Sequence, residues 1–168
     1  TFCLDRGGLV GEDGPTHHGA FDLSYLRHIP NMTLMAPKDE PELQSMIALA
    51  VELPGPAAVR YPRGVGPGHS LTDRSEAISL GQAETLQEGG PTAVLAIGSR
   101  VYPTLEAAKE VEDKTQARIG VINARFVKPF PEEDIRALLR QGVSKLLVVE
   151  ENALAGGFGS AVLEFLTE

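Results

Sequence analysis

The sequence predicts an α/β protein made of two units, each built on a parallel β-sheet flanked by helices. Short apolar runs alternate with longer segments whose apolar residues recur at helical spacing, a pattern typical of parallel sheets. This alternation occurs twice, before and after a weakly patterned polar stretch at 64–90. The chain has 168 residues, 42% of them hydrophobic and 23% charged, which is typical of a globular protein.

The first unit is predicted to alternate strand, helix, strand, helix and strand, at residues 1–5, 21–27, 32–35, 39–52 and 57–61. The first strand is expected to be buried, with Cys3 in the core. Pro30 stops the first helix, because the residue before a proline disfavours the helical backbone. Asp39 as N-cap, with Glu42 three positions later, starts the second helix.

The second unit follows a predicted crossover linker at 64–90. Its expected strands and helices lie at 93–97, 101–111, 117–122, 131–140 and 145–149, with a last helix after 159. The glycine-rich run at 156–159 does not have the spacing of a dinucleotide fingerprint, so we interpret it as a close approach of helix and neighbouring backbone. The chain begins inside a strand and ends inside a helix, and we therefore expect both units to be truncated parts of a longer protein.

Composition argues against several classes of partner. The net charge of −8 is spread along the chain, and neither a Lys/Arg cluster nor a series of stacking aromatics points to nucleic acid. A single cysteine cannot form an internal disulfide. No apolar run approaches the roughly 20 residues of a membrane span, so no membrane partner is expected.

The segment 5–22 is the strongest candidate for function. It combines five glycines, four acidic residues, Arg6 and two adjacent histidines. His17 and His18 point to opposite sides of an extended chain, and no cysteine or third histidine lies at a zinc-like spacing, so we expect no metal site. A histidine near Asp13 could carry a proton or donate a hydrogen bond. A long surface connection with solvated histidines remains the alternative.

Two arginines lie where parallel strands end. Arg6 follows the first strand and Arg63 follows the strand at 57–61, at the sheet edge where ligands of such folds bind. Together they could hold a phosphate or carboxylate, although two surface arginines would look the same in sequence. Arg60 lies inside its strand and is expected to pack or form an ion pair. The residues for which we expect no chemistry are Ser24, His28, His69 and Ser160.

Several longer patterns carry a resemblance. They are DRGGLVGEDGPTHHGAFD at 5–22, SYLR at 24–27, IPNM at 29–32, RYPRG at 60–64, RFVKP at 125–129 and VEENA at 149–153. In this order they resemble the 1-deoxy-D-xylulose-5-phosphate synthase family, thiamine-diphosphate enzymes of the transketolase superfamily. Position 7 is Gly where that family usually has Ala. The resemblance implies the later part of a pyrimidine-binding domain at 1–63, a crossover linker at 64–90 and a truncated transketolase C-terminal domain at 91–168.

The resemblance also implies a function. The whole enzyme would be a transferase that condenses pyruvate with glyceraldehyde 3-phosphate, releases carbon dioxide and begins non-mevalonate isoprenoid biosynthesis, with a link to thiamine biosynthesis. Arg6 and Arg63 would grip the aldehyde's phosphate, and Asp13 and His17 would lie at the substrate pocket as catalytic residues. The expected cofactors, thiamine diphosphate and Mg²⁺, would be bound largely by residues outside this fragment, so we assign no cofactor or metal residue within it.

The family further implies a homodimer in the bacterial cytoplasm, or in the plastid stroma for a plant protein, with the cytoplasm preferred. This fragment alone is expected to be inactive. Two alternatives stay open. One is another enzyme of the superfamily, such as a 2-oxo-acid dehydrogenase β subunit or a transketolase. The other is a non-catalytic fragment on the same scaffold, since fold does not fix function.

Overall fold

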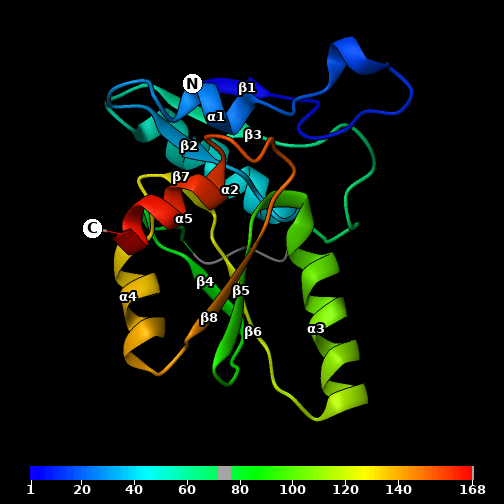
Figure 1. Ribbon diagram of the computed structural model, residues 1–168. Helices are drawn as coiled ribbons and strands as arrows, with labels where there is room; N and C mark the ends of the chain where they lie inside the picture. The colour runs from blue at the N-terminus through cyan, green and yellow to red at the C-terminus, as the bar shows by residue number, and fades with distance from the viewer. Residues whose placement is uncertain (72–76, 168) are drawn as a thin grey trace.

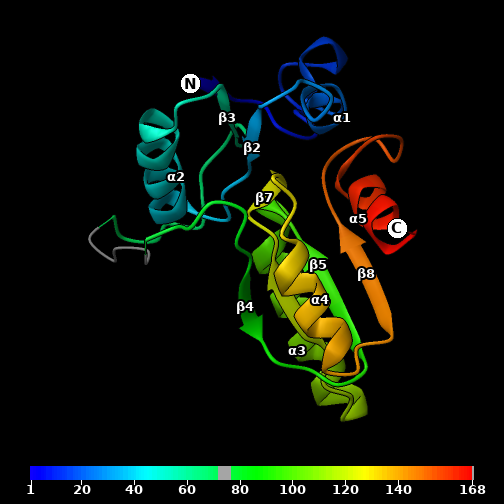
Figure 2. The ribbon, with the colours of Figure 1, turned by 90° about the vertical axis from the view of Figure 1, so that its left-hand side faces the viewer.

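The computed structural model describes residues 1–71 and 77–167, which form two four-stranded sheets with helices packed around them (Figures 1 and 2). The first sheet has the order β1 (Phe2–Leu4), β3 (Ala57–Arg60), β2 (Thr33–Met35) and β7 (Phe126–Lys128). The second has the order β4 (Glu84–Gln87), β6 (Gly120–Asn123), β5 (Thr92–Ala96) and β8 (Lys145–Val149). The predicted α/β class is confirmed.

Two edge strands were not predicted from the sequence. β7 pairs antiparallel with β2, and β4 pairs antiparallel with β6, whereas the remaining strand pairs are parallel. β7 has only three residues, and β4 is a polar four-residue segment inside the stretch predicted to be a linker. Segments this short show no clear alternation. β7 adds a strand from the second half of the chain to the first sheet, and it thereby joins the two units.

The helices follow the predicted order. They are α1 (Asp22–Leu26), α2 (Glu40–Glu52), α3 (Val101–Thr115), α4 (Glu132–Arg140) and α5 (Phe158–Thr167), with 3₁₀ turns η1 (Pro15–His17) and η2 (Gly98–Arg100). The second sheet lies between α3 on one side and α4 on the other (Figure 1). The predicted N-cap of α2 is confirmed, because Glu42 N donates to Asp39 Oδ1 at 2.9 Å. None of the described helices combines the length and apolarity needed to cross a membrane.

A continuous apolar core crosses the junction between the units. Leu23 and Leu34 of the first unit pack in the same cluster as Leu95, Ile122 and Phe158 of the second. A smaller cluster, with Met35, Met46, Val59 and Phe126 among its members, lies under α2. Because both clusters contain residues from both halves of the chain, the two units fold against each other as one body.

The prediction for the first strand was wrong in one respect. Cys3 is exposed, and Phe2 retains 55% of its accessible surface. β1 is an edge strand that pairs with β3 on one side only. Its apolar composition indicates a buried strand, but the described residues do not cover it.

Candidate active site

The base of the loop 5–22 is fixed at the carboxyl ends of β1 and β3. Gly7 N donates to Tyr61 O at 2.9 Å, Gly19 N donates to Arg6 O at 2.9 Å, and Gly8 N donates to Gly19 O at 3.2 Å. A Cβ atom on Gly19 would lie 2.4 Å from Arg6 O, so only glycine allows this approach. Arg6 itself has a φ of 60°, and its side chain reaches Asp13 of the same loop.

The two predicted phosphate-binding arginines meet at one carboxylate. Arg6 Nε lies 2.8 Å from Asp13 Oδ2, and Arg63 Nη1 forms an ion pair with the same oxygen. Arg6 Nη1 also pairs with Asp5 at 2.7 Å. Hydrogen bonds, first from Arg6 and then from Arg63, lower the pKa of Asp13. Asp13 therefore stays ionised near neutral pH and holds the arginines together. Each guanidinium has N–H groups left to bind an anion.

The two histidines of the loop lie in different environments. His17 ends the 3₁₀ turn η1 and is exposed, and its Nδ1 is 3.0 Å from Thr16 Oγ1. Its described hydrogen bond does not connect it with Asp13, so the structure brings the two arginines to Asp13 but leaves His17 apart from them. His18 instead accepts a hydrogen bond from Val10 N at 2.9 Å, which stabilises the loop.

A cleft of about 670 Å³ opens beside Arg63, between the two units. The first unit contributes residues around Lys38 and the turn after β3, and the second contributes η2, the start of α3 and Glu151. Tyr102 in this wall donates a hydrogen bond to Asp39 at 2.6 Å. The cleft thus has walls from both units, and Arg63 of the arginine pair lines it.

Sequence reasoning missed the part that the second unit plays at this loop. The segment after β8 lies against α1, since Asn152 Oδ1 accepts from Leu23 N at 3.2 Å and Asn152 Nδ2 donates to Ser24 Oγ at 2.8 Å. At the glycines before α5, the close approach predicted for neighbouring backbone involves a side chain as well, since a Cβ on Gly157 would lie 2.9 Å from Ala153 O. A Cβ on Gly157 would lie 2.6 Å from the Glu150 carboxylate, which caps the first turn of α5.

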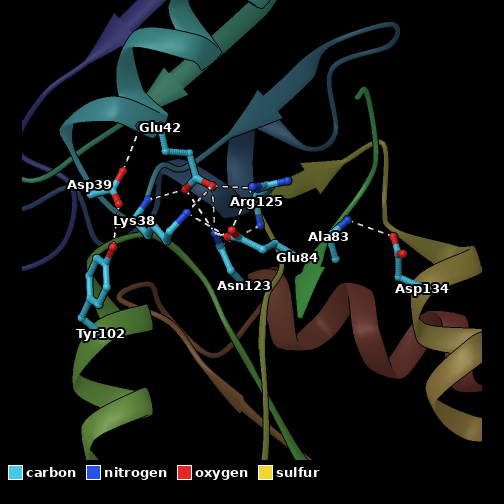
Figure 3. A network of polar contacts seen from close by, with 9 residues as sticks. All are labelled: Lys38, Asp39, Glu42, Ala83, Glu84, Tyr102, Asn123, Arg125 and Asp134. Atoms are coloured by element: carbon cyan, nitrogen blue, oxygen red, sulfur yellow. Dashed lines mark hydrogen bonds and ion pairs between the residues drawn. The ribbon is translucent and has the colours of Figure 1, made fainter. Parts of the chain in front are cut away.

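A buried ionic network also joins the units (Figure 3). Glu42 of α2 is fully buried and accepts from Lys38 N at 2.6 Å, Asn123 Nδ2 at 2.9 Å and Arg125 Nε at 2.7 Å. Glu84 of β4 pairs with Lys38 at 2.8 Å and with Arg125 at 3.3 Å. Burial alone raises the pKa of Glu84. The hydrogen bonds from Lys38 and Asn123, together with the nearby positive charges, outweigh this effect, so the net shift of the pKa is downward. From the sequence, Glu42 was expected only to support the N-cap of α2, whereas in the structure it also binds Asn123 and Arg125 of the second unit.

Metal-ligating side chains do not cluster among the described residues. Among them, no three His, Cys, Asp or Glu side chains gather closely enough to ligate one. The carboxylates at the site, Asp5 and Asp13, are paired with arginines instead. A metal or a metal-bound cofactor is therefore not assigned to these residues.

Comparison with known proteins matches each of the two units to a domain of one protein family. The family model "transketolase, pyrimidine binding domain" matches residues 1–67, and "transketolase, C-terminal domain" matches residues 81–168. A 1-deoxy-D-xylulose-5-phosphate synthase of Oleidesulfovibrio alaskensis is 56% identical over all of this chain and 26% of its own length. Synthase 1 of Geobacter sulfurreducens is 57% identical over 99% of this chain and 26% of its own length. The chain thus spans about a quarter of the length of these relatives.

Solved structures show the same fold. A split-gene transketolase, described as an inactive β4 tetramer, superposes with a TM-score of 0.83 at 30% identity, covering 98% of this chain and 52% of that one. A transketolase from Campylobacter jejuni superposes with a TM-score of 0.64 at 22% identity, covering 98% of this chain and 29% of that one, which supports the fold alone.

Proposed function

The chain belongs to the transketolase family, and from this premise we propose that it is part of a 1-deoxy-D-xylulose-5-phosphate synthase. The whole protein would condense pyruvate with glyceraldehyde 3-phosphate, with loss of carbon dioxide. Curated relatives of that name, 50–57% identical to this chain over nearly all of its length, support this activity over that of a transketolase or a 2-oxo-acid dehydrogenase. A homodimer in the cytoplasm and a role in isoprenoid biosynthesis are part of the same proposal.

The observation that carries the proposal is the convergence of Arg6 and Arg63 on Asp13, because Arg63 also lines the cleft. Two guanidinium groups at one place suit a phosphate monoester, which accepts paired N–H bonds from each. Asp13 would keep both groups oriented before the phosphate arrives. The aldehyde carbon would then extend from the arginines into the cleft.

His17 would donate to the substrate's oxygens or exchange protons with them. Its ring is exposed on η1, in the same loop as the phosphate-binding residues, and an imidazole can both donate and accept hydrogen bonds. Thiamine diphosphate, when bound to the whole enzyme, supplies the carbanion chemistry of the decarboxylation. With Mg²⁺, it would be held largely by residues outside this fragment.

The experiment that tests the proposal is Arg63→Ala in the full-length enzyme. We expect the KM for glyceraldehyde 3-phosphate to rise about 10- to 100-fold, because a lost bond between a charged donor and phosphate costs about 1.5–3 kcal/mol. The KM for pyruvate should stay within about twofold. Arg118→Ala, which removes an exposed arginine paired with Glu112, is the matched control and should change neither constant. Equal rises in both KM values for Arg63→Ala would refute the phosphate assignment.

A further inference from the structure

Arg60 is a buried charge that the proposed chemistry does not use. It ends β3, is 5% exposed and lies three positions before Arg63. Burial lowers its pKa more than the nearby carboxylates of Asp22 and Glu151 raise it. Its Nε has no hydrogen-bond partner, and Asp22 Oδ2 is 3.7 Å away. Burying a guanidinium destabilises the folded protein unless its contacts offset the loss of hydration. The groups that Arg60 contacts are therefore the ones whose positions it fixes.

One set of contacts fixes the base of the loop 5–22. Arg60 Nη2 donates to Gly19 O at 2.8 Å. Gly19 in turn donates to Arg6 O, which lies next to the side chain that reaches Asp13. Gly7 packs directly on the guanidinium, since a Cβ atom there would lie 2.6 Å from Arg60 Nε. The side chain of Arg60 therefore supports the backbone on both sides of Arg6.

The other contact reaches the second unit. The same Nη2 atom of Arg60 donates to Glu151 O, in the segment that follows β8. The Glu151 carboxylate accepts from Ser99 Oγ at 2.5 Å, and it lies so close to Gly8 that a Cβ there would be 2.8 Å from it. Ala153 N donates to Ala20 O at 2.6 Å. The segment after β8 therefore contacts the loop 5–22 near its start, at Gly8, and near its end, at Ala20.

We propose that Arg60 is a positioning residue that ties the loop 5–22 to the segment after β8 that contains Glu151. It thereby sets where Arg6 meets the phosphate of the acceptor substrate, glyceraldehyde 3-phosphate. This inference rests on the proposed function. It assigns the second unit a part in acceptor binding, although that unit contributes neither arginine of the pair. Arg60 acts through Gly19 and Arg6 and does not touch the substrate.

The test uses Arg60→Met in the full-length enzyme, which removes the donors and keeps an apolar stem. We expect the KM for glyceraldehyde 3-phosphate to rise about tenfold and the KM for pyruvate to change by less than twofold. The matched control is Arg125→Met, which removes a second buried arginine, 8% exposed, whose partners lie in the network of Figure 3. It should lower the melting temperature and leave both KM values within twofold.

A double-mutant cycle with Arg6→Ala decides whether Arg60 acts through Arg6. Adding Arg60→Met to Arg6→Ala should raise the aldehyde KM by less than about twofold, because residues that act through one another are not additive. Multiplied effects would overturn the proposal, as would an Arg60→Met profile that matches the Arg125→Met profile. If Arg63→Ala raises the aldehyde KM as expected but Arg60→Met leaves it unchanged, this inference is refuted and the proposed function is not. An Arg63→Ala enzyme with an unchanged aldehyde KM refutes the proposed function.

Two further measurements cover loss of folding. Asn152→Ala loosens the same segment without leaving a buried charge, and should raise the aldehyde KM about two- to fivefold. Hydrogen exchange at Gly8 and Gly19 needs no turnover, and should quicken about tenfold in Arg60→Met but not in Arg125→Met. Unchanged exchange at both glycines would overturn the proposal.

Discussion

Glu42→Gln should cost several kcal/mol of stability although it keeps the size of the side chain. The Glu42 carboxylate is fully buried and is bonded by Arg125 at 2.7 Å, by Asn123 at 2.9 Å and by Lys38 Nζ at 3.2 Å. Removing one partner of a buried ion pair costs about 3–5 kcal/mol. Glu84 still pairs with both cations, and its side chain is 29% exposed, so part of that cost is recovered. We expect a loss of about 2–4 kcal/mol in the free energy of unfolding.

Urea unfolding followed by circular dichroism measures this loss through the shift of the midpoint. The matched control is Glu110→Gln, because Glu110 pairs with Lys114 at 3.1 Å on the exposed face of α3. That pair should contribute about 0.5 kcal/mol or less. A Glu42→Gln loss within about 0.5 kcal/mol of the control would refute the reasoning that Glu42 is the charge that holds Lys38 and Arg125 in the interior.

Two other expectations concern turnover and pH. His17→Ala in the full-length enzyme should lower kcat about 100-fold, as expected for the loss of general acid–base assistance, and an unchanged kcat would remove His17 from the mechanism. Glu84 has a folded-state pKa below its ordinary 4.5, so it stabilises the protein above that value and loses this contribution as the pH falls through the lower folded pKa. Glu84→Gln should therefore flatten the fall in the urea midpoint as the pH drops below 4.5, whereas an equal fall in both proteins would count against Glu84 as its source.

Most of the fold was predictable because its signals are local. The cap at Asp39 and the apolar spacing of α2 are both visible within a dozen residues, and the helix begins where they indicate. β4 and β7 were missed because they are short strands whose position depends on partners far along the chain. Cys3 was placed in the core because apolar composition does not tell an edge strand from a central one.

The candidate site was predictable to the extent that it follows from strand ends. Arg6 and Arg63 were expected at the same sheet edge because parallel strands end there together, and the two side chains do meet at Asp13. The contribution of Glu151 could not be predicted in the same way. It depends on a segment some 130 residues from the loop 5–22, and a glutamate after a strand has no spacing rule that points to this contact.

The junction between the units therefore has two polar parts with different consequences. The network around Glu42 lies under α2 and involves charges that face one another, so a change there should be seen in the free energy of unfolding. The contacts of Arg60 lie under the loop 5–22, and their loss should be seen in acceptor binding. Strand β7 begins directly after Arg125 of the network and pairs with β2, which in turn pairs with the strand β3 that ends at Arg60. If the second unit served only to stabilise the first, Arg60→Met and Arg125→Met would change the same quantity, and the geometry of Gly19 and Glu151 around Arg60 indicates that they do not.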